Sequence, residues 1–206
     1  MLTILYEEDD PELMDRVFSF RHQRFVEHMG WQELRRSDQR EKDQYDGADV
    51  LHAVLIHEHQ VIGYSRLLPT TSPHFVGDYS QLDAEALPCG PEIFEWSRCA
   101  TLPCAPFVKG MAASDLLMTG VLECLIRIGA RAIVFLTYPP LVMMMRQRGY
   151  PVQVLADISL NAERVQVVFS TLPEDLLARH RESYSIQGSL LSFRTKLEMG
   201  WRKRGS

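Results

Sequence analysis

The stretch Glu92-Ile93-Phe94-Glu95-Trp96-Ser97-Arg98-Cys99-Ala100-Thr101, residues 92–101, decides how the rest of the chain is interpreted. Its β-branched and aromatic residues lie between Pro91 and Pro103, a pattern that predicts a strand. A buried strand keeps a carboxylate and a guanidinium only where they are paired or used. Strict alternation puts Glu95 and Arg98 on opposite faces, so a shared pocket requires a β-bulge between them. The plainer alternative is a structural ion pair on an edge strand.

The composition is that of an ordinary globular protein. Of the 206 residues, 46% are hydrophobic and 24% are charged, which suffices for one core and predicts a single domain over residues 1–206. No apolar run reaches the ~18 residues that a membrane helix needs. The acidic N-terminus has no cleavable signal pattern, so we expect a cytoplasmic protein that does not bind membranes. The four cysteines lack metal-ligand spacing, and no metal site is expected.

Charge is divided unevenly along the chain. Residues 1–103 hold 9 Lys/Arg and 19 Asp/Glu, a net charge of −10, whereas residues 104–206 hold 13 and 8, a net charge of +5. The acidic half suits a cationic substrate and the basic half an anionic partner, with a solvated surface as the alternative. No basic helix or aromatic stacking array is present, so nucleic acid is not an expected partner.

The order of the predicted elements indicates the fold. Asp9 or Asp10 before Pro11 predicts the start of a helix that runs to near Gly30. Further strands are expected at 2–6, 50–57, 61–68, 132–137, 152–155 and 164–170, and further helices at 109–129, 140–148 and 173–181. This order predicts an α/β protein, a three-layer α/β/α sandwich with a mixed, mostly antiparallel central sheet. The glycine-rich motifs of Rossmann and P-loop folds are absent.

Two longer segments carry no clean period. Residues 31–49 are polar and crowded with charge, and a loop of this length is usually a functional lid or disordered. We expect Trp31 to anchor it to the body of the protein. Residues 69–88 are predicted to be an irregular connector, which contains Tyr79.

Charged and aromatic residues of the first half form one joint pattern. It consists of Arg21-x3-Phe25-x5-Trp31, Asp43-x2-Asp46, Arg66 and Glu95-x2-Arg98. In order and spacing this pattern resembles the signature of the LuxI-type acyl-homoserine-lactone synthases, the autoinducer synthases of bacterial quorum sensing. The match covers about the first hundred residues, and the second half is similar only in its rhythm of helices and strands. One position departs from the family pattern, because Tyr79 stands where a Phe is usual.

The resemblance implies a GNAT-like fold and a two-step acyltransferase reaction. The α-amine of S-adenosylmethionine attacks an acyl thioester, carried by acyl carrier protein or by CoA. The methionine carboxylate then displaces the sulfonium carbon, which closes the lactone and releases methylthioadenosine. Both molecules are substrates, and no cofactor is implied.

The resemblance also implies the site residues. Glu95 and Asp43 are the candidate bases that deprotonate the amine, and either carboxylate can be the base. The expected substrate-binding residues are Arg21, Phe25, Trp31, Asp46, Arg66, Tyr79, Arg98, Thr137 and Met143. Among them the arginines would grip carboxylates, the carboxylates would complement the cationic substrate, and Thr137 and Met143 would line an acyl tunnel. Backbone N–H groups at a bulge beside Glu95 would stabilise the oxyanion.

Two other functions remain open from the residues alone. A GNAT-type N-acyltransferase that uses acyl-CoA would carry a glycine-rich pyrophosphate loop, and residues 107–112 lack its spacing. A non-catalytic small-ligand sensor would explain a pocket but not the convergence of ionisable groups. Basic residues spread over the second half, including 202–204, favour acyl carrier protein over CoA as the donor. The acyl chain, its 3-position and the oligomeric state are left open.

Overall fold

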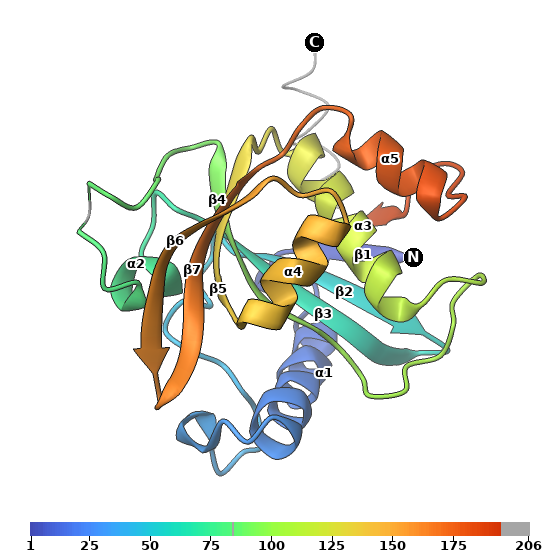
Figure 1. Cartoon of the computed structure of the whole chain (residues 1–206). Coiled ribbons are helices and arrows are strands. Elements are labelled where there is room, and N and C mark those ends of the chain that lie inside the picture. The colour runs from blue at the N-terminus through green and yellow to red at the C-terminus, as the bar shows by residue number, and fades with distance from the viewer. Residues whose placement is uncertain (84, 195–206) are drawn as a thin grey trace. The chain divides into compact units, whose positions relative to one another are not determined.

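The computed structural model describes residues 1–83 and 85–194 (Figure 1). Within these residues eight strands hydrogen-bond in the order β6-β7-β5-β4-β3-β2-β1-β8. The strands are β1 (Leu2–Leu5), β2 (Leu51–His57), β3 (Gln60–Pro69), β4 (Ile93–Thr101), β5 (Ala132–Thr137), β6 (Val152–Leu160), β7 (Glu163–Thr171) and β8 (Leu191–Phe193). The pairs β1–β8 and β4–β5 are parallel, whereas β1–β2, β5–β7 and β6–β7 are antiparallel. The predicted mixed, mostly antiparallel α/β fold is therefore confirmed.

Five α-helices, two 3-10 turns and one π-helical segment accompany these strands in the described part of the chain. The α-helices are α1 (Pro11–Arg21), α2 (Phe75–Tyr79), α3 (Ala113–Arg127), α4 (Pro139–Gln147) and α5 (Leu176–Ser183). The 3-10 turns are η1 (Glu7–Asp9) and η3 (Gln32–Leu34), and a π-helical segment, η2 (His22–His28), continues α1.

The chain divides into two compact units. Of the described residues, the first unit holds 1–66, 98–121 and 189–194, and the second holds 67–83, 85–97 and 122–188. Strands β3 and β4 and helix α3 each contribute residues to both units. The expectation of a single domain over residues 1–206 stays a prediction.

In the first unit, α1 forms because its start is capped and one side of it is apolar. The Asp10 carboxylate accepts a hydrogen bond from the Leu13 backbone N–H at 3.0 Å, and Pro11 occupies the first helical position. The apolar side of the helix packs with Leu5 of β1 and Val54 of β2 in one buried cluster. This cluster fixes α1 on one face of the strands.

Helix α3 packs on the opposite face in the same unit. Leu2 and Leu5 differ in parity along β1, so their side chains point to opposite faces. A Cβ atom on Gly120 of α3 would lie only 2.7 Å from a methyl carbon of Leu2. The helix can approach the strand this closely because residue 120 has no side chain. Strands between α1 and α3 give the predicted three layers.

The second unit is built around β5, which is apolar except for Thr137 at its end. Strand β6 continues through a two-residue turn into β7, the partner of β5, and Figure 1 shows β6 and β7 side by side. Both turn residues, Asn161 and Ala162, have positive φ angles. The two strands are longer than predicted because polar residues such as Asp157 are tolerated on the exposed outer strand.

Two elements were not predicted. Helix α2 lies in the connector that was expected to be irregular, and its five residues are too few to show a helical period. Strand β8 pairs in parallel with β1, far away in sequence, and its three residues carry no local signal. Helix α3 begins at Ala113, after a bridge between Val108 and Met111 that replaces the expected first turn.

Candidate active site

Six charged side chains form a buried ring in the first unit. Three are guanidinium groups, from Arg21 of α1, Arg66 of β3 and Arg98 of β4, and three are carboxylates of the 31–49 loop, from Glu41, Asp43 and Asp46. Each carboxylate contacts two guanidiniums, and each guanidinium contacts two carboxylates, so the charges alternate around a closed ring. Five of these six residues belong to the predicted site, and the structure brings those five together.

Arg21 anchors one side of the ring. Its Nε donates to Glu41 Oε2 at 2.5 Å, while Nη1 and Nη2 donate to the two carboxylate oxygens of Asp46 at 2.7 and 2.9 Å. The Arg21 guanidinium also lies 5.5 Å from the centre of the Tyr64 ring. Arg21 is fully buried.

A hydrogen-bonded pair, His52 and Tyr64, lies on the Arg21 side of the ring. His52 Nδ1 and the Tyr64 hydroxyl are 2.7 Å apart and hydrogen-bonded, and both residues are fully buried. Burial lowers the pKa of His52 to about 3, so the imidazole is uncharged at neutral pH. Arg21 therefore contacts, through Tyr64, a buried pair of polar side chains that carries no charge.

Arg66 links the two aspartates. Its Nη1 donates to Asp43 Oδ1 at 2.6 Å and to Asp46 Oδ1 at 3.0 Å. Backbone N–H groups complete the turn, because Asp43 N donates to Asp46 Oδ2 at 2.9 Å and Tyr45 N donates to Asp43 Oδ1 at 3.0 Å. Backbone N–H groups of the loop thus bind two of the carboxylates that also bind the arginines.

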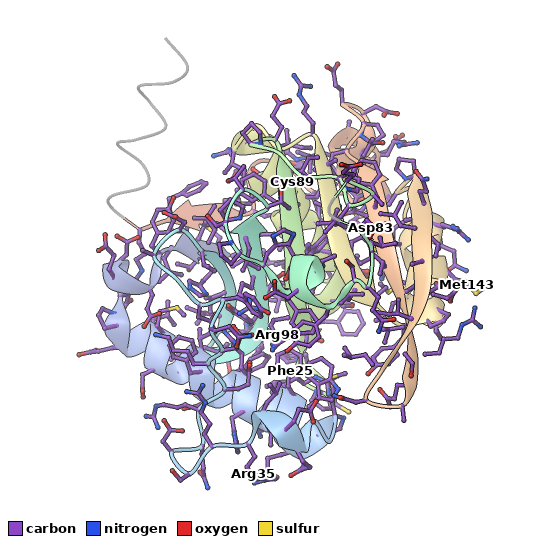
Figure 2. The ribbon with its side chains drawn as sticks, turned by 90° about the vertical axis from the view of Figure 1, so that its left-hand side faces the viewer. Phe25, Arg35, Asp83, Cys89, Arg98 and Met143 are labelled. Carbon is purple, nitrogen blue, oxygen red and sulfur yellow. The ribbon has the colours of Figure 1, made fainter. Side chains whose placement is uncertain are left out.

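Arg98 joins the ring to an aromatic pair. Its Nη2 donates to Asp43 Oδ2 at 2.9 Å and to Glu41 Oε1 at 3.2 Å. Its guanidinium carbon lies 5.6 Å from the centre of the Phe25 ring and 5.5 Å from that of Trp31. The two rings stack at 5.1 Å with an interplanar angle of 15°. Figure 2 shows Arg98 and Phe25 next to each other.

The backbone at Arg98 departs from a regular strand. Its φ angle is +54°, in the left-handed region, although it lies inside β4. A residue of this kind within a strand is typical of a bulge and interrupts strict alternation. Strict alternation along the strand would place Glu95 and Arg98 on opposite faces, and the bulge removes that constraint.

The charged state of the ring follows from its geometry. Burial alone would raise the pKa of Asp46, but Arg21 and Arg66 outweigh burial and hold this pKa well below its usual range. Burial would likewise raise the pKa of Glu41, and Arg98 and Arg21 lower it instead. Burial would lower the pKa of Arg66, and Asp46 raises it. The ring therefore stays ionised and carries no net charge at neutral pH.

The later part of the 31–49 loop is tied to the body of the first unit. The Glu41 backbone N–H donates to the carbonyl of Phe18 at 3.1 Å, and Lys42 Nζ donates to Glu7 Oε1 at 2.6 Å. Arg40 pairs with Asp15 of α1. Residues 32–39 are mostly exposed, as are residues 47–49 at the end of the loop. The lid stays a prediction.

Glu95 lies in the second unit and is fully buried. Its Oε2 accepts a hydrogen bond from the backbone N–H of Val76, in α2, at 2.7 Å. The strand β4 places it beside β5, where Glu95 is in register with Val134. Its role as the base, and the joint action with Asp43, stay predictions.

Three further predicted residues also lie in the second unit. Tyr79 is 40% exposed and stacks on Phe75, with ring centres 4.5 Å apart. Thr137 ends β5 and is half-buried. Met143 is 62% exposed on α4 and projects outward in Figure 2, whereas Met145 of the same helix is buried. The acyl tunnel stays a prediction, and residues 202–204 lie outside the described residues.

Glu41 was not predicted, although it bridges Arg21 and Arg98. It stands in a loop with many charges, and nothing local distinguishes it from Glu33 or Asp38. The signal that would have found it is the count of partners. Three arginines placed in interior elements require three carboxylates, and the loop offers the third two residues before Asp43.

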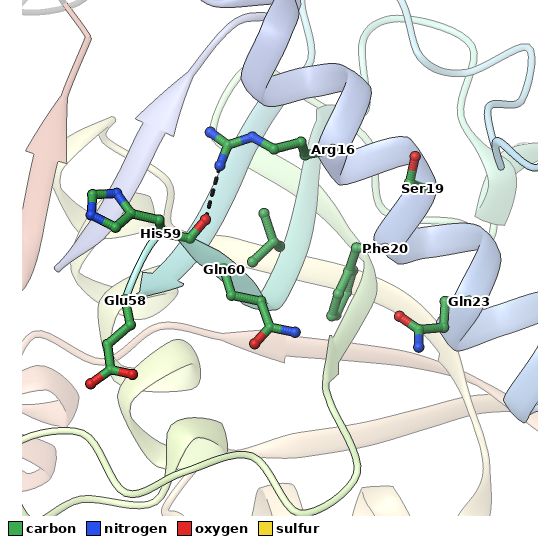
Figure 3. A pocket seen from close by; sticks show the side chains of 8 residues that line it. Arg16, Ser19, Phe20, Gln23, Glu58, His59 and Gln60 are labelled. Atoms are coloured by element: carbon green, nitrogen blue, oxygen red, sulfur yellow. Dashed lines mark hydrogen bonds between the residues drawn. The ribbon is translucent and has the colours of Figure 1, made fainter.

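The two described surface hollows are lined by other residues. One, of about 410 Å³, lies between α1 and the β2–β3 hairpin and is shown in Figure 3, where Arg16 donates to the His59 carbonyl at 3.0 Å. The other, of about 440 Å³, is lined by residues of α1, η2 and the 31–49 loop, including His22 and Gln39. Neither hollow is lined by a predicted site residue. In the described chain no helix is long and apolar enough to cross a membrane.

Comparison with curated proteins identifies relatives over parts of the chain. The acyl-homoserine-lactone synthase of Ralstonia solanacearum is 33% identical over 147 residues, 68% of this chain and 72% of that protein. The isovaleryl-homoserine lactone synthase of Bradyrhizobium diazoefficiens is 38% identical over 96 residues, 46% of this chain and 42% of that protein. The acyl-homoserine-lactone synthase of Acinetobacter nosocomialis is 35% identical, and the match spans 54% of this chain and 63% of that protein. The chain thus matches about half of the length of the last two relatives.

Comparison with solved structures extends over nearly the whole chain. A CoA-dependent acyl-homoserine lactone synthase, BjaI, solved with SAM and isopentyl-CoA, has a TM-score of 0.86 at 22% identity, covering 98% of this chain and 99% of that chain. An acyl-CoA N-acyltransferase from Pseudomonas aeruginosa has a TM-score of 0.57 at 14% identity, covering 82% and 98%. The fold is thus shared with both classes of enzyme. The model of the autoinducer synthase family matches residues 5–181, and the chain therefore belongs to the autoinducer synthase family.

Proposed function

We propose that the protein makes an N-acyl-L-homoserine lactone from S-adenosylmethionine and an acyl thioester. The observation that carries this proposal is the ring of alternating charges capped by the Phe25–Trp31 pair. It brings together seven of the eight signature residues in a chain of this family, and the eighth, Glu95, lies in the second unit. The relatives are named acyl-homoserine-lactone synthases, and one structure with the same fold was solved with SAM and an acyl-CoA.

The aromatic pair and Arg98 are suited to bind the adenosyl group. Stacked rings offer a flat apolar face to a nucleobase, and the Arg98 guanidinium fixes their position. The ring of six charged side chains, which Arg98 joins to this aromatic pair, carries no net charge, so it does not repel a sulfonium or an ammonium group. Asp43 lies at its edge, with 8% of its side chain exposed, and is the carboxylate placed to meet the ammonium group.

The chemistry then needs a base and a leaving thiol. Glu95, or Asp43, takes a proton from the substrate ammonium, and the free amine forms a bond to the thioester carbonyl carbon. The C–S bond breaks, and the thiolate leaves and takes up a proton. The methionine carboxylate next displaces the sulfonium sulfur from carbon, which closes the lactone and releases methylthioadenosine. Atoms and charge balance without an oxidant, a reductant or a metal.

The acyl donor can be acyl carrier protein or CoA, and we place the reaction in the cytoplasm, where both thioesters are available. Two carriers require different surfaces. Acyl carrier protein needs a broad basic face, whose contribution salt screens, whereas CoA needs a compact phosphate site. A comparison of kcat/KM for matched acyl groups on both carriers, at low and moderate salt, separates them.

The test of the proposal uses the purified full chain. S-adenosylmethionine is supplied with a panel of acyl-CoA and acyl-carrier-protein donors, and methylthioadenosine, free thiol and lactone are measured. We expect all three products in equal amounts with at least one donor. Thiol release with simple amines but not with S-adenosylmethionine would favour the N-acyltransferase function instead. Tight binding of S-adenosylmethionine without turnover of any donor would favour the sensor.

A further inference from the structure

The connector that contains α2 is hydrogen-bonded to strand β4 in the second unit. Thr70 Oγ1 donates to the carbonyl of Ile93 at 2.9 Å, and the Thr70 backbone N–H donates to the same carbonyl at 3.2 Å. Two residues further along β4, the Glu95 carboxylate accepts the Val76 N–H. The start of the connector and the start of α2 are therefore both fixed relative to the strand that carries Glu95.

His74 controls the short segment between these two anchor points. It immediately precedes α2 and is only 7% exposed. Its Nδ1 lies 2.9 Å from the carbonyl oxygen of Ser72. Because a carbonyl can only accept, Nδ1 carries the proton and donates this hydrogen bond. The opposite nitrogen, Nε2, is buried and has no hydrogen-bond partner among the described residues.

The imidazole is also held against the backbone of α2. A Cβ atom on Gly77 would lie 3.1 Å from Cε1 and 3.2 Å from Nε2 of His74. These distances are shorter than ordinary contacts with Cβ atoms, so the ring occupies the space that the missing side chain of Gly77 leaves. The carbonyl of His74 accepts the N–H of Asp78 at 3.2 Å, which closes the first turn of the helix. One side chain thus fixes the turn from Ser72 to Gly77.

We propose that His74 is a positioning residue for Glu95. The clamped imidazole sets the backbone of residues 72–77, and this backbone directs the Val76 N–H at Glu95 Oε2. The amide holds the carboxylate in one orientation and favours its ionised form, which is the form a base needs. The role rests on the proposed function of Glu95 as the base. Nothing in the family signature includes position 74.

The kinetic test compares a variant that keeps an N–H donor near the position of Nδ1 with a variant that has no donor there. Asparagine places an N–H near the position of Nδ1, so His74→Asn retains the bond to Ser72 and kcat within a few-fold of wild type. His74→Leu removes this bond, and we expect kcat to fall by up to about 10²-fold, the cost of a small misplacement. KM for S-adenosylmethionine should stay near wild type, since the aromatic pair is untouched. A loss in His74→Asn equal to that in His74→Leu would overturn the proposal.

Gly77→Ala gives an independent variant that leaves His74 in place. The new methyl group would lie 3.1–3.2 Å from the imidazole, so the ring must shift by a few tenths of an ångström, and kcat should fall in the same direction as in His74→Leu. The double variant Gly77→Ala/His74→Leu should be no worse than His74→Leu alone, because both changes act through one ring. Losses that multiply in the double variant would contradict a shared mechanism. Far-UV circular dichroism and thermal melting are recorded for each variant.

A readout that does not depend on turnover is the Val76 amide resonance, observed after valine-selective ¹⁵N labelling. Glu95→Gln removes the charged acceptor and should shift this amide proton upfield. His74→Leu should shift it the same way, and His74→Asn should not. An unchanged Val76 amide in His74→Leu would overturn the positioning role, even if the wild-type protein makes lactone. If the wild-type protein makes no lactone, the proposed function fails, and the amide shift still decides the role of His74.

Discussion

Replacing Asp46 by Asn is the sharpest test of the buried ring, because it keeps the size of the side chain and removes one charge. The carboxylate accepts four hydrogen bonds, two from Arg21, one from Arg66 and one from the Asp43 backbone. An amide offers one oxygen and one NH₂ group. Its NH₂ group would face two N–H donors, so Asp46→Asn loses about half of these bonds and leaves a net positive charge buried.

The size of the effect follows from this geometry. Removing one partner of a buried ion pair costs about 3–5 kcal/mol, because the remaining charges stay desolvated. A domain has a total stability of about 5–15 kcal/mol, so the variant should be close to its folding limit. Urea denaturation measures the loss, and Asp49→Asn, an exposed change in the same loop, is the matched control with a loss below about 0.5 kcal/mol.

The effect should also depend on pH in a defined direction. The folded-state pKa of Asp46 lies below its unfolded-state value, so the ionised carboxylate contributes its full stability above the unfolded value of about 3.9. This contribution is lost as pH falls from there towards the folded value. The gap in stability between wild type and Asp46→Asn should therefore be constant from pH 7 to about pH 5 and shrink below about pH 4. A gap under about 1 kcal/mol at pH 7 would refute the reasoning.

The remaining predictions concern catalysis and the loop. Glu95→Gln should lower kcat by about 10²–10⁴-fold while the thermal midpoint stays near wild type, and near-normal turnover would leave Glu95 a purely structural role. Arg98→Lys should lower turnover severely, because a point charge cannot replace the planar contacts to two carboxylates and two rings, and an unimpaired variant would rule out that grip. Trypsin should cut the free protein after Arg36 rather than Arg40, which is paired with Asp15, and methylthioadenosine should protect the site. Equal cutting with and without ligand would show that the exposed part of the loop is no lid.

The elements with a local signal were predictable from the sequence. The cap at Asp10 and Pro11 marked the start of α1, and the apolar run of β5 marked an interior strand. An interruption between Glu95 and Arg98 was expected only if the two share a pocket, and the positive φ angle at Arg98 is such an interruption, while the shared pocket stays a prediction. These features depend on residues that are close in sequence, and a sequence pattern describes only such residues.

The features that the sequence did not reveal depend on distant partners. Strand β8 exists because it pairs with β1, and α2 is held by Glu95 of β4. Glu41 joins the ring only because two arginines from separate elements meet there. Charge in an unperiodic loop does not indicate which carboxylates turn inward.

The closed ring of charges also constrains how this sequence can diverge. Loss of any one member leaves an unbalanced charge in the interior, and a second, opposite loss is needed to restore neutrality. The single-step intermediate has lost about 3–5 kcal/mol, most of the margin that a natural protein has. A single substitution at any of these six positions is therefore strongly destabilising. Divergence of the ring therefore has to proceed by paired changes of opposite charge.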